Sequence, residues 1–204
     1  MADAVVKWLQ LAGQAACCRN CDLWRPATQT VFGVGPVPAD MMLVGEQPGD
    51  QEDLAGRPFI GPAGRVLDEA LRDAGLERDD LYLTNAVKHF KWTPRGKRRI
   101  HQKPNREEVQ ACAPWLEAEV SLVSPHVVVL LGATAAQSVM GSSFRVTAER
   151  GKLLDSALAP AVIATVHPSS ILRASTSADR RTAMTAFVSD LRVAAAVMDH
   201  DRLG

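Results

Sequence analysis

Four short apolar runs, each followed by a stretch of helical character, constrain the fold of this chain more than any other feature. The runs occupy residues 41–45, 81–84, 127–131 and 161–166. A short, almost wholly apolar run is typical of a strand buried on both faces. Such strands alternating with helices form a parallel sheet covered on both sides. The sequence therefore predicts an α/β fold around a four-stranded parallel sheet.

The segments between these runs carry recognisable helix-end signals. Pro62 and Gly75 bracket one helix, at the positions where proline commonly begins and glycine commonly ends a helix. Asn105 and Glu108 resemble a capping box that opens another helix. We expect helices at residues 4–16, 62–75 and 105–123, after residue 132, and at 180–198.

The length and the distribution of apolar residues suit one soluble domain. The chain has 204 residues, enough to bury a single substantial core. No apolar run approaches the length that spans a membrane, and the N-terminus lacks the basic start and long apolar run of a secretory signal. We therefore expect one domain over residues 1–204, a cytoplasmic location and no membrane partner.

Polar side chains follow three of the four predicted strands at the point where each strand ends. Glu46 and Gln47 follow the first strand, Asn85 the second and His167 the fourth. Ligands of parallel sheets bind beyond the carboxyl ends of the strands. A histidine there could donate a hydrogen bond to a developing oxyanion, although a single strand-end histidine is more often structural. Together these polar residues predict an active site at the carboxyl edge of the sheet.

The loop after the first strand is rich in glycine. It reads Gly-Glu-Gln-Pro-Gly-Asp over residues 45–50, and a helix opens behind it at Pro62. Glycines let a backbone approach a ligand, and a helix start offers free N–H groups to an anion. The loop is not a Walker motif, because no Gly-Lys-Ser/Thr follows. An irregular structural loop is an equally good explanation, and Phe59 would more often belong to a core.

The segment from residue 81 to residue 106 holds eight Lys or Arg and no Asp or Glu, although the chain as a whole is charge-neutral. This charge favours an anionic partner. Pro94, Gly96 and Pro104 favour a loop over a helix or a central strand. His101 is the only side chain there that could act as a nucleophile or base near neutral pH. On composition alone, a solvated loop touching phosphates is the more ordinary interpretation.

Three cysteines have spacing that is typical of a metal site. Cys18 and Cys21 form a C-x-x-C pair, Cys112 is distant in sequence, and His89 is the obvious fourth candidate. Zinc accepts three thiolates and an imidazole, whereas an iron–sulfur cluster more often takes four cysteines. Reduced thiols without a metal are the simpler alternative.

Together these residues resemble the uracil-DNA glycosylase superfamily, in the branch that carries a four-iron cluster. The resemblance rests on residues 45–50 with Glu52 and Asp53, the Phe-Ile-Gly-Pro-Ala-Gly of residues 59–64, Thr84-Asn85 and the His-Pro-Ser-Ser of residues 167–170. It extends from Cys18 to about residue 197. It implies a three-layer α/β/α sandwich with a four-stranded parallel sheet, in agreement with the pattern of strands and helices.

Two departures from that branch resemble its X-type members, which remain covalently attached to DNA. A Lys88-His89 pair stands where the ordinary members have Lys-Cys, and the Gly-Lys-Arg-Arg-Ile-His of residues 96–101 is an insertion. The resemblance implies His101 as the attacking group. It also implies a [4Fe-4S] cluster held by Cys18, Cys21, His89 and Cys112.

The resemblance further implies 2′-deoxyuridine in DNA as the substrate, preferably single-stranded or flipped out of the stack. Phe59 would stack on the uracil, Asn85 would read its O4 and N3, and His167 would donate to O2. Glu46 would accept a hydrogen bond from His101. Gln47 and Asp50 would shape the pocket, and the strand would be gripped by Lys97, Arg98, Arg99, Ser169, Ser170 and Arg173. We expect a monomer.

Two alternatives remain open at this stage. An ordinary iron–sulfur glycosylase would deliver water to C1′, with Glu46 as base or charge stabiliser, and would turn over many times. A module stabilised by a bound zinc ion would bind single-stranded nucleic acid through the basic loop without catalysis. That second alternative leaves Glu46, Asn85 and His167 at the strand ends unexplained.

Overall fold

A five-stranded sheet forms the centre of the molecule in the computed structural model, which describes residues 2–202. Its strand order is β2-β1-β5-β7-β6. The four predicted strands are confirmed and run parallel: β1 (Met41–Gly45), β2 (Leu81–Asn85), β5 (Val127–Leu131) and β7 (Ala161–Thr165). The sequence did not predict β6 (Leu153–Leu154), which pairs antiparallel with β7 at one edge.

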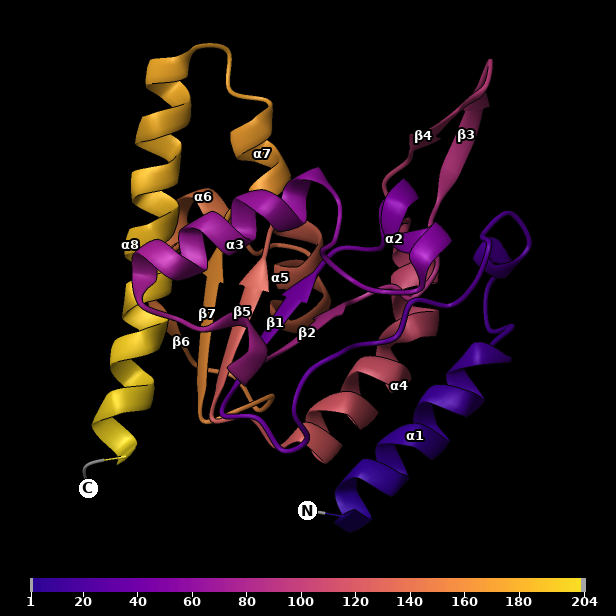
Figure 1. Ribbon diagram of the computed structural model, residues 1–204, viewed down its shortest axis with the longest axis horizontal. Helices are drawn as coiled ribbons and strands as arrows, with labels where there is room; N and C mark the ends of the chain where they lie inside the picture. The colour runs from indigo at the N-terminus through magenta and orange to yellow at the C-terminus, as the bar shows by residue number, and fades with distance from the viewer. Residues whose placement is uncertain (1, 203–204) are drawn as a thin grey trace.

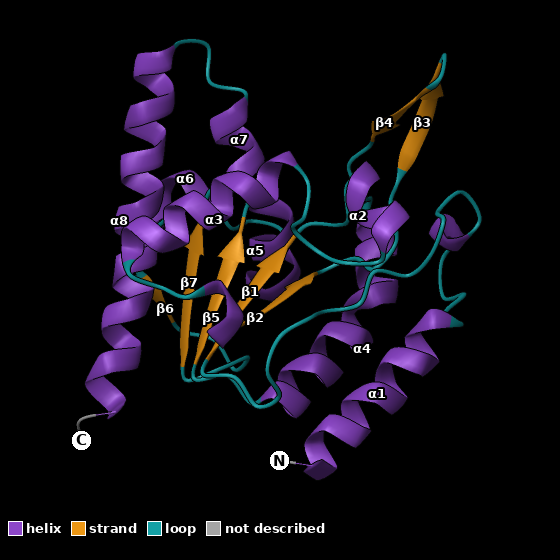
Figure 2. Cartoon of the chain, in the orientation of Figure 1, coloured by secondary structure: helices purple, strands orange, loops and turns teal. Residues whose placement is uncertain are grey.

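Helices cover both faces of this sheet, which makes the predicted three-layer α/β/α sandwich (Figures 1 and 2). Alternate residues of β1 point to opposite faces, because side chains alternate along a strand. Met41 and Leu43 belong to the core under α3 (Pro62–Ala74), α7 (Pro168–Leu172) and α8 (Ser177–Arg202). Met42 and Val44 belong to the core under α4 (Arg106–Val123) and α5 (Ala133–Met140). All residues of the four parallel strands are therefore buried.

The helix ends follow the predicted signals. Pro62 occupies the first turn of α3, and Gly75 closes it with a left-handed φ of 78°. The capping box at the start of α4 is present in both directions, between Asn105 and Glu108. The terminal helices are α1 (Ala2–Ala16) and α8, which is longer than predicted. The short helices α2 (Asp50–Ala55), α6 (Val146–Glu149), η1 (Asp22–Trp24) and η2 (Arg78–Asp80) were not predicted, and neither was α7.

The basic segment forms a β-hairpin, which corrects the prediction of an irregular loop. Strands β3 (Trp92–Arg95) and β4 (Arg98–His101) pair antiparallel, with Trp92 opposite His101. Gly96 lies in the turn with a φ of 59°. Pro94 is tolerated because both strands of an isolated hairpin are edge strands. The hairpin projects from the same side of the molecule as the carboxyl ends of the parallel strands (Figure 1).

Within residues 2–202, none of the helices combines the length and the hydropathy that crossing a lipid bilayer would require.

Candidate active site

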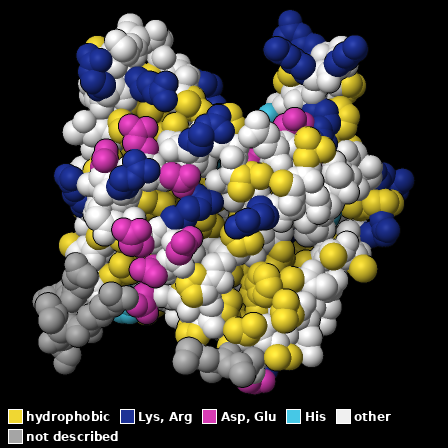
Figure 3. All heavy atoms as spheres, in the orientation of Figure 1, with side chains coloured by type: hydrophobic (Ala, Val, Ile, Leu, Met, Phe, Trp, Pro, Cys, Tyr) yellow, Lys and Arg dark blue, Asp and Glu magenta, His cyan; other side chains and the backbone are white. Residues whose placement is uncertain are grey.

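A cleft of about 930 Å³ opens at the carboxyl edge of the sheet. It brings together ten of the side chains that the sequence singled out, from segments far apart in the chain. These are Glu46, Gln47, Asp50, Phe59, Asn85, His101, His167, Ser169, Ser170 and Arg173. Lys and Arg side chains gather on the hairpin and on the opposite rim, over α7 and the start of α8 (Figure 3). The cleft is therefore flanked by positive charge on both sides.

Glu46 lies at the exit of β1 and contacts His101 of the hairpin. One carboxylate oxygen is 3.3 Å from His101 Nε2, and the other accepts a hydrogen bond from Thr134 Oγ1 at the start of α5. Burial alone would raise the pKa of Glu46, but the hydrogen bonds from His101 and Thr134 hold that pKa below its usual value. Glu46 is therefore a carboxylate at neutral pH, able to orient an imidazole.

His167 caps the start of α7 and is held as a neutral imidazole. Its Nδ1 accepts a hydrogen bond from Ser169 N at 3.1 Å, so Nε2 carries the ring proton and is a donor. Desolvation lowers the pKa of His167 to about 4, and the nearby charges of Glu46, Arg173 and His101 modify it less. A donor that is uncharged at neutral pH therefore lines the cleft.

Phe59 and Asn85 lie beside this donor. The Phe59 ring lies over Gly45, where a Cβ atom would be only 2.6 Å from the ring Cζ. The ring stacks near His167, with centroids 6.3 Å apart and an interplanar angle of 27°. Asn85 pairs with Gly45 across the β1–β2 ladder. An aromatic face, an amide and an imidazole donor on adjoining walls suit a planar ligand with polar edges.

Gln47 holds the base of the hairpin. Its side-chain oxygen accepts from Lys91 N at 3.0 Å, and its side-chain nitrogen donates to the carbonyl of Gln102 at 2.9 Å. The amide therefore binds the backbone just before β3 and just after β4. Gln47 lines the cleft, and its side-chain amide is engaged by the backbone at both ends of the hairpin.

Arg99, predicted as a phosphate contact, anchors the hairpin to α2 in the structure. Its guanidinium lies 2.5 Å from carboxylate oxygens of both Asp50 and Asp53, and also donates to Thr28 Oγ1 at 3.1 Å. Burial lowers the pKa of Arg99, but the two carboxylates raise it overall, so the ion pairs hold. Asp50, which also lines the cleft, binds Arg99 through one carboxylate oxygen and through its backbone carbonyl.

The other predicted DNA contacts divide into two groups. Lys97 and Arg98 are exposed at the hairpin tip. Ser169 and Ser170 are instead turned toward His167: the Ser169 hydroxyl is 2.8 Å from His167 Nδ1, and the Ser170 hydroxyl donates to the His167 carbonyl at 2.8 Å. Arg173 is exposed and donates to Ser169 Oγ. The two serines therefore orient the histidine in the structure.

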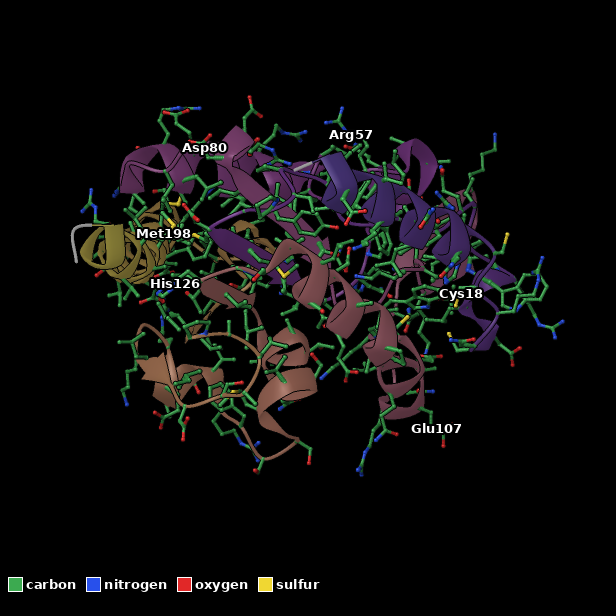
Figure 4. The ribbon with its side chains drawn as sticks, turned by 90° about the horizontal axis from the view of Figure 1, so that it is seen from below. Cys18, Arg57, Asp80, Glu107, His126 and Met198 are labelled. Atoms are coloured by element: carbon green, nitrogen blue, oxygen red, sulfur yellow. The ribbon has the colours of Figure 1, made fainter. Side chains whose placement is uncertain are left out.

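Cys18 lies on the side of the molecule away from His126 and Met198 (Figure 4), and Cys112 is part of α4. The proximity of Cys21 and Cys112 lowers the pKa of the Cys21 thiol and raises the pKa of the Cys112 thiol. Trp115 Nε1 donates to Cys18 Sγ at 3.1 Å, and Cys21, Cys112 and Trp115 share one apolar cluster. The three thiols predicted as ligands are thus gathered on one side of the fold.

His89 carries the clearest sign of a missing partner. Its Nε2 is 2.9 Å from Thr30 Oγ1, but its buried Nδ1 has no hydrogen-bond partner. A buried polar atom without a partner is costly and calls for an explanation such as a metal. Among residues 2–202, no three His, Cys, Asp or Glu side chains converge closely enough for one metal ion. A cluster does not require that convergence, because its ligands bind different iron ions.

A buried ion pair behind Asn85 escaped the sequence analysis. Lys88 and Glu119 are almost fully inaccessible and paired with each other. Lys88 Nζ also donates to the Asn85 carbonyl at 2.6 Å, and Tyr82 and Thr84 donate to Glu119. The sequence did indicate a buried charge, because Glu119 interrupts the apolar face that Leu116 and Val120 form on α4. Thr134, the donor to Glu46, had no such signal.

Comparisons with known proteins agree with this geometry. A family model described as the uracil DNA glycosylase superfamily matches residues 32–192. A Type-4 uracil-DNA glycosylase of Thermotoga maritima is 40% identical over 157 residues, which cover 76% of this chain and 78% of that protein. One from Pyrobaculum aerophilum is 36% identical over 76% of this chain and 80% of that protein. One from Archaeoglobus fulgidus is 43% identical over 60% of this chain and 58% of that protein.

Proposed function

The chain belongs to the uracil-DNA glycosylase superfamily, and we propose that it removes uracil from DNA and stays covalently attached to the sugar through His101. Uracil-DNA glycosylase activity is supported by the Type-4 relatives. The covalent step rests on one observation above the others. An imidazole on an anchored hairpin lies 3.3 Å from an ionised carboxylate at the rim of the base-binding cleft.

Recognition of the base is assigned to the inner wall of the cleft. The Phe59 ring offers a stacking surface, and the Asn85 amide offers a donor and an acceptor to O4 and N3, which separates uracil from cytosine. The substrate is therefore a deoxyuridine turned out of the base stack.

Cleavage breaks the bond between C1′ and N1, and the electron pair leaves with the base. The negative charge on uracil spreads over O2 and N1, and the neutral His167 donates a hydrogen bond to O2. A donor placed in advance at such an oxyanion is worth about 3 kcal/mol. Because the pKa of His167 is about 4, this group remains a neutral donor throughout the physiological pH range.

The sugar is left as an oxocarbenium ion, and a ring nitrogen of neutral His101 bonds to C1′ through its lone pair. The positive charge then resides on the alkylated imidazole, beside the Glu46 carboxylate. An alkylated imidazole is a poor leaving group, so the product persists and each molecule reacts once. Water held by Glu46 would give ordinary turnover instead.

The exposed Lys97 and Arg98 are proposed to bind phosphates, together with Arg173 on the opposite rim. Single-stranded DNA is the preferred substrate, because no base pair has to be opened before the uracil enters the cleft. One sheet with a core on each face supports a single domain, and we propose that it acts as a monomer.

Cys18, Cys21, His89 and Cys112 are proposed to hold a [4Fe-4S] cluster. The support is the three gathered thiols and the unpartnered Nδ1 of His89. A bound cluster would supply a structural link between η1, α4 and the segment that follows Asn85. None of the steps assigned to Glu46, His101 or His167 requires it.

Uracil release tests the glycosylase assignment. Equimolar protein and a single-stranded oligonucleotide with one uracil should yield free uracil, detected by chromatography, whereas matched cytosine and thymine oligonucleotides should yield no free base. Asn85→Ala should reduce uracil release by at least about tenfold, since a lost pair of hydrogen bonds to the base costs on the order of 2 kcal/mol. A protein that binds all three oligonucleotides equally and releases no base would be a nucleic-acid-binding module, not an enzyme.

A further inference from the structure

Phe59 has a backbone conformation that a bulky residue rarely adopts. Its φ is +54°, in the left-handed region. Ser124 is the other residue besides glycine with positive φ within residues 2–202, and it closes α4, where this conformation is ordinary. Phe59 precedes α3 by three residues and closes no helix. Such a conformation persists only where the surroundings hold it, and such positions cluster at functional sites.

The Phe59 carbonyl is held by Arg78. Arg78 Nη2 donates to the Phe59 carbonyl at 3.0 Å and lies 3.4 Å from that of Pro58. Its Nη1 forms an ion pair with Asp68 on α3, so the guanidinium is itself oriented. A side chain at Gly64, in the first turn of α3, would overlap the same carbonyl. The guanidinium therefore ties η2 and α3 to the strained turn.

This anchor determines where the Phe59 ring lies. The left-handed φ sets the direction of the Cα–Cβ bond, and the ring then lies over Gly45 and near His167. With the carbonyl released, the turn can relax to the common region of φ, which carries the ring away from Gly45. The anchor is thus linked to the stacking surface through the backbone, without contact between Arg78 and the cleft.

We propose that Arg78 is a positioning residue for uracil, which fixes the stacking face of Phe59 by binding the two carbonyls of its turn. This inference rests on the proposed function. Phe59 stacks on uracil both before and after the glycosidic bond breaks. Loss of Arg78 should therefore weaken substrate binding more than it slows the chemical step.

The test is a double-mutant cycle in which the rate of uracil release is measured with protein in excess over DNA. Arg78→Met should raise the protein concentration for half-maximal rate by about tenfold, the cost of one or two hydrogen bonds to a charged group, and change the maximal rate by less than about twofold. In a Phe59→Ala background, Arg78→Met should have no further effect, because the ring it positions is gone. An equal loss in both backgrounds would overturn the proposal.

Matched variants separate this role from a general structural one. Arg72→Met, an exposed change on α3 that removes the same charge, should leave the protein concentration for half-maximal rate and the maximal rate unchanged. Asp68→Asn should weaken binding in the same direction but less, and Arg78→Lys should be intermediate, because an ammonium cannot reproduce the guanidinium fork. If Arg72→Met weakened binding as much as Arg78→Met, surface charge would explain the effect and the proposal would fall.

A second measurement needs no DNA. In the DNA-free protein, Arg78→Met should speed amide hydrogen exchange in residues 57–61 and leave exchange in β1 unchanged. If wild-type protein released no uracil, the proposed function would fail, and the exchange would still decide whether Arg78 holds the turn. Unchanged exchange would show that it does not.

Discussion

The carboxylate of Glu46 is held from two sides, by His101 of the hairpin and by Thr134 of α5. His101 is half exposed, so the carboxylate is what gives its ring a definite position at the rim. The two histidines of the cleft thus have different environments. His167 is kept neutral by desolvation, whereas His101 has an anion beside it, ready to stabilise a cation.

Thr134→Val tests the support of Glu46. Loss of one hydrogen bond to the carboxylate should raise the pKa of Glu46 toward its usual value, since that bond helps lower it. Activity that needs the ionised form is lost as pH falls through this pKa, so the acidic limb of the rate profile should move to higher pH. At neutral pH the rate of covalent attachment should fall by about tenfold or more, the cost of one hydrogen bond to a charged group. Rates measured between pH 4 and pH 8 give both quantities.

Thr182→Val, an exposed change on α8, is the control and should leave the profile unchanged. An acidic limb of Thr134→Val that stays in place would mean that Glu46 does not govern the reaction.

Single residues also show where sequence reasoning stops. Glu46, Asn85 and His167 could be predicted, because the ends of parallel strands meet at one edge whatever the helices do. Thr134 and Arg78 could not, since a threonine in a helix and an arginine in a polar turn are ordinary until the fold brings them to a carboxylate and a carbonyl. The ion pairs of Arg99 could not be predicted either, because its partners, Asp50 and Asp53, are distant in sequence.

The hairpin of β3 and β4 is the element that separates the covalent proposal from ordinary turnover. Its two ends are joined by Gln47, and β4 is joined to α2 by Arg99. Both contacts are tertiary. Pro94 and Gly96 correctly argued against a helix, but no local pattern encodes the partners that make this segment a hairpin rather than a loop.

Arg99→Met should slow covalent attachment to DNA without slowing uracil release to the same extent. Without the ion pairs the hairpin loses its anchor and His101 its position, whereas Phe59, Asn85 and His167 do not depend on it. Covalent attachment should fall by about tenfold or more relative to uracil release, given the usual cost of breaking a hydrogen-bonded charge pair that is largely buried. Both products can be measured in one reaction.

Arg95→Met removes the same charge from an exposed position in the same hairpin and should not change the ratio of attachment to release. If Arg99→Met reduced attachment and uracil release in the same proportion, the hairpin would not act on attachment alone, and the proposal would be contradicted.

Across the whole molecule, a chain of buried polar contacts joins β2, which ends at Asn85, to Cys112. Lys88 binds the Asn85 carbonyl through its side chain, and its backbone N–H lies 3.5 Å from Cys112 Sγ. Through Glu119 and Tyr82 the same network reaches Trp8 of α1. The layers of the sandwich could be predicted from apolar periodicity. This network could not, because it depends on three-dimensional partners for polar groups inside the core.

Glu119→Gln should lower the free energy of unfolding by about 3 kcal/mol, because it leaves the Lys88 ammonium buried without its anion. The double variant Lys88→Met/Glu119→Leu should recover only part of that loss, because it removes the buried charge but leaves Gly33 N, Tyr82 and Thr84 without their acceptor. Urea unfolding of both variants measures the difference. If Glu119→Gln were as stable as the wild type, Lys88 and Glu119 would not be a charged pair in the folded protein.

The bond that we propose between His101 and C1′ can be tested in one incubation of protein with a single-stranded uracil oligonucleotide, followed by a denaturing gel. Wild-type protein should give a denaturant-resistant protein–DNA band in one-to-one yield, absent with the thymine oligonucleotide, and His101→Ala should give none. Persistence of the band in His101→Ala, or release of abasic DNA over many turnovers by wild-type protein, would contradict it.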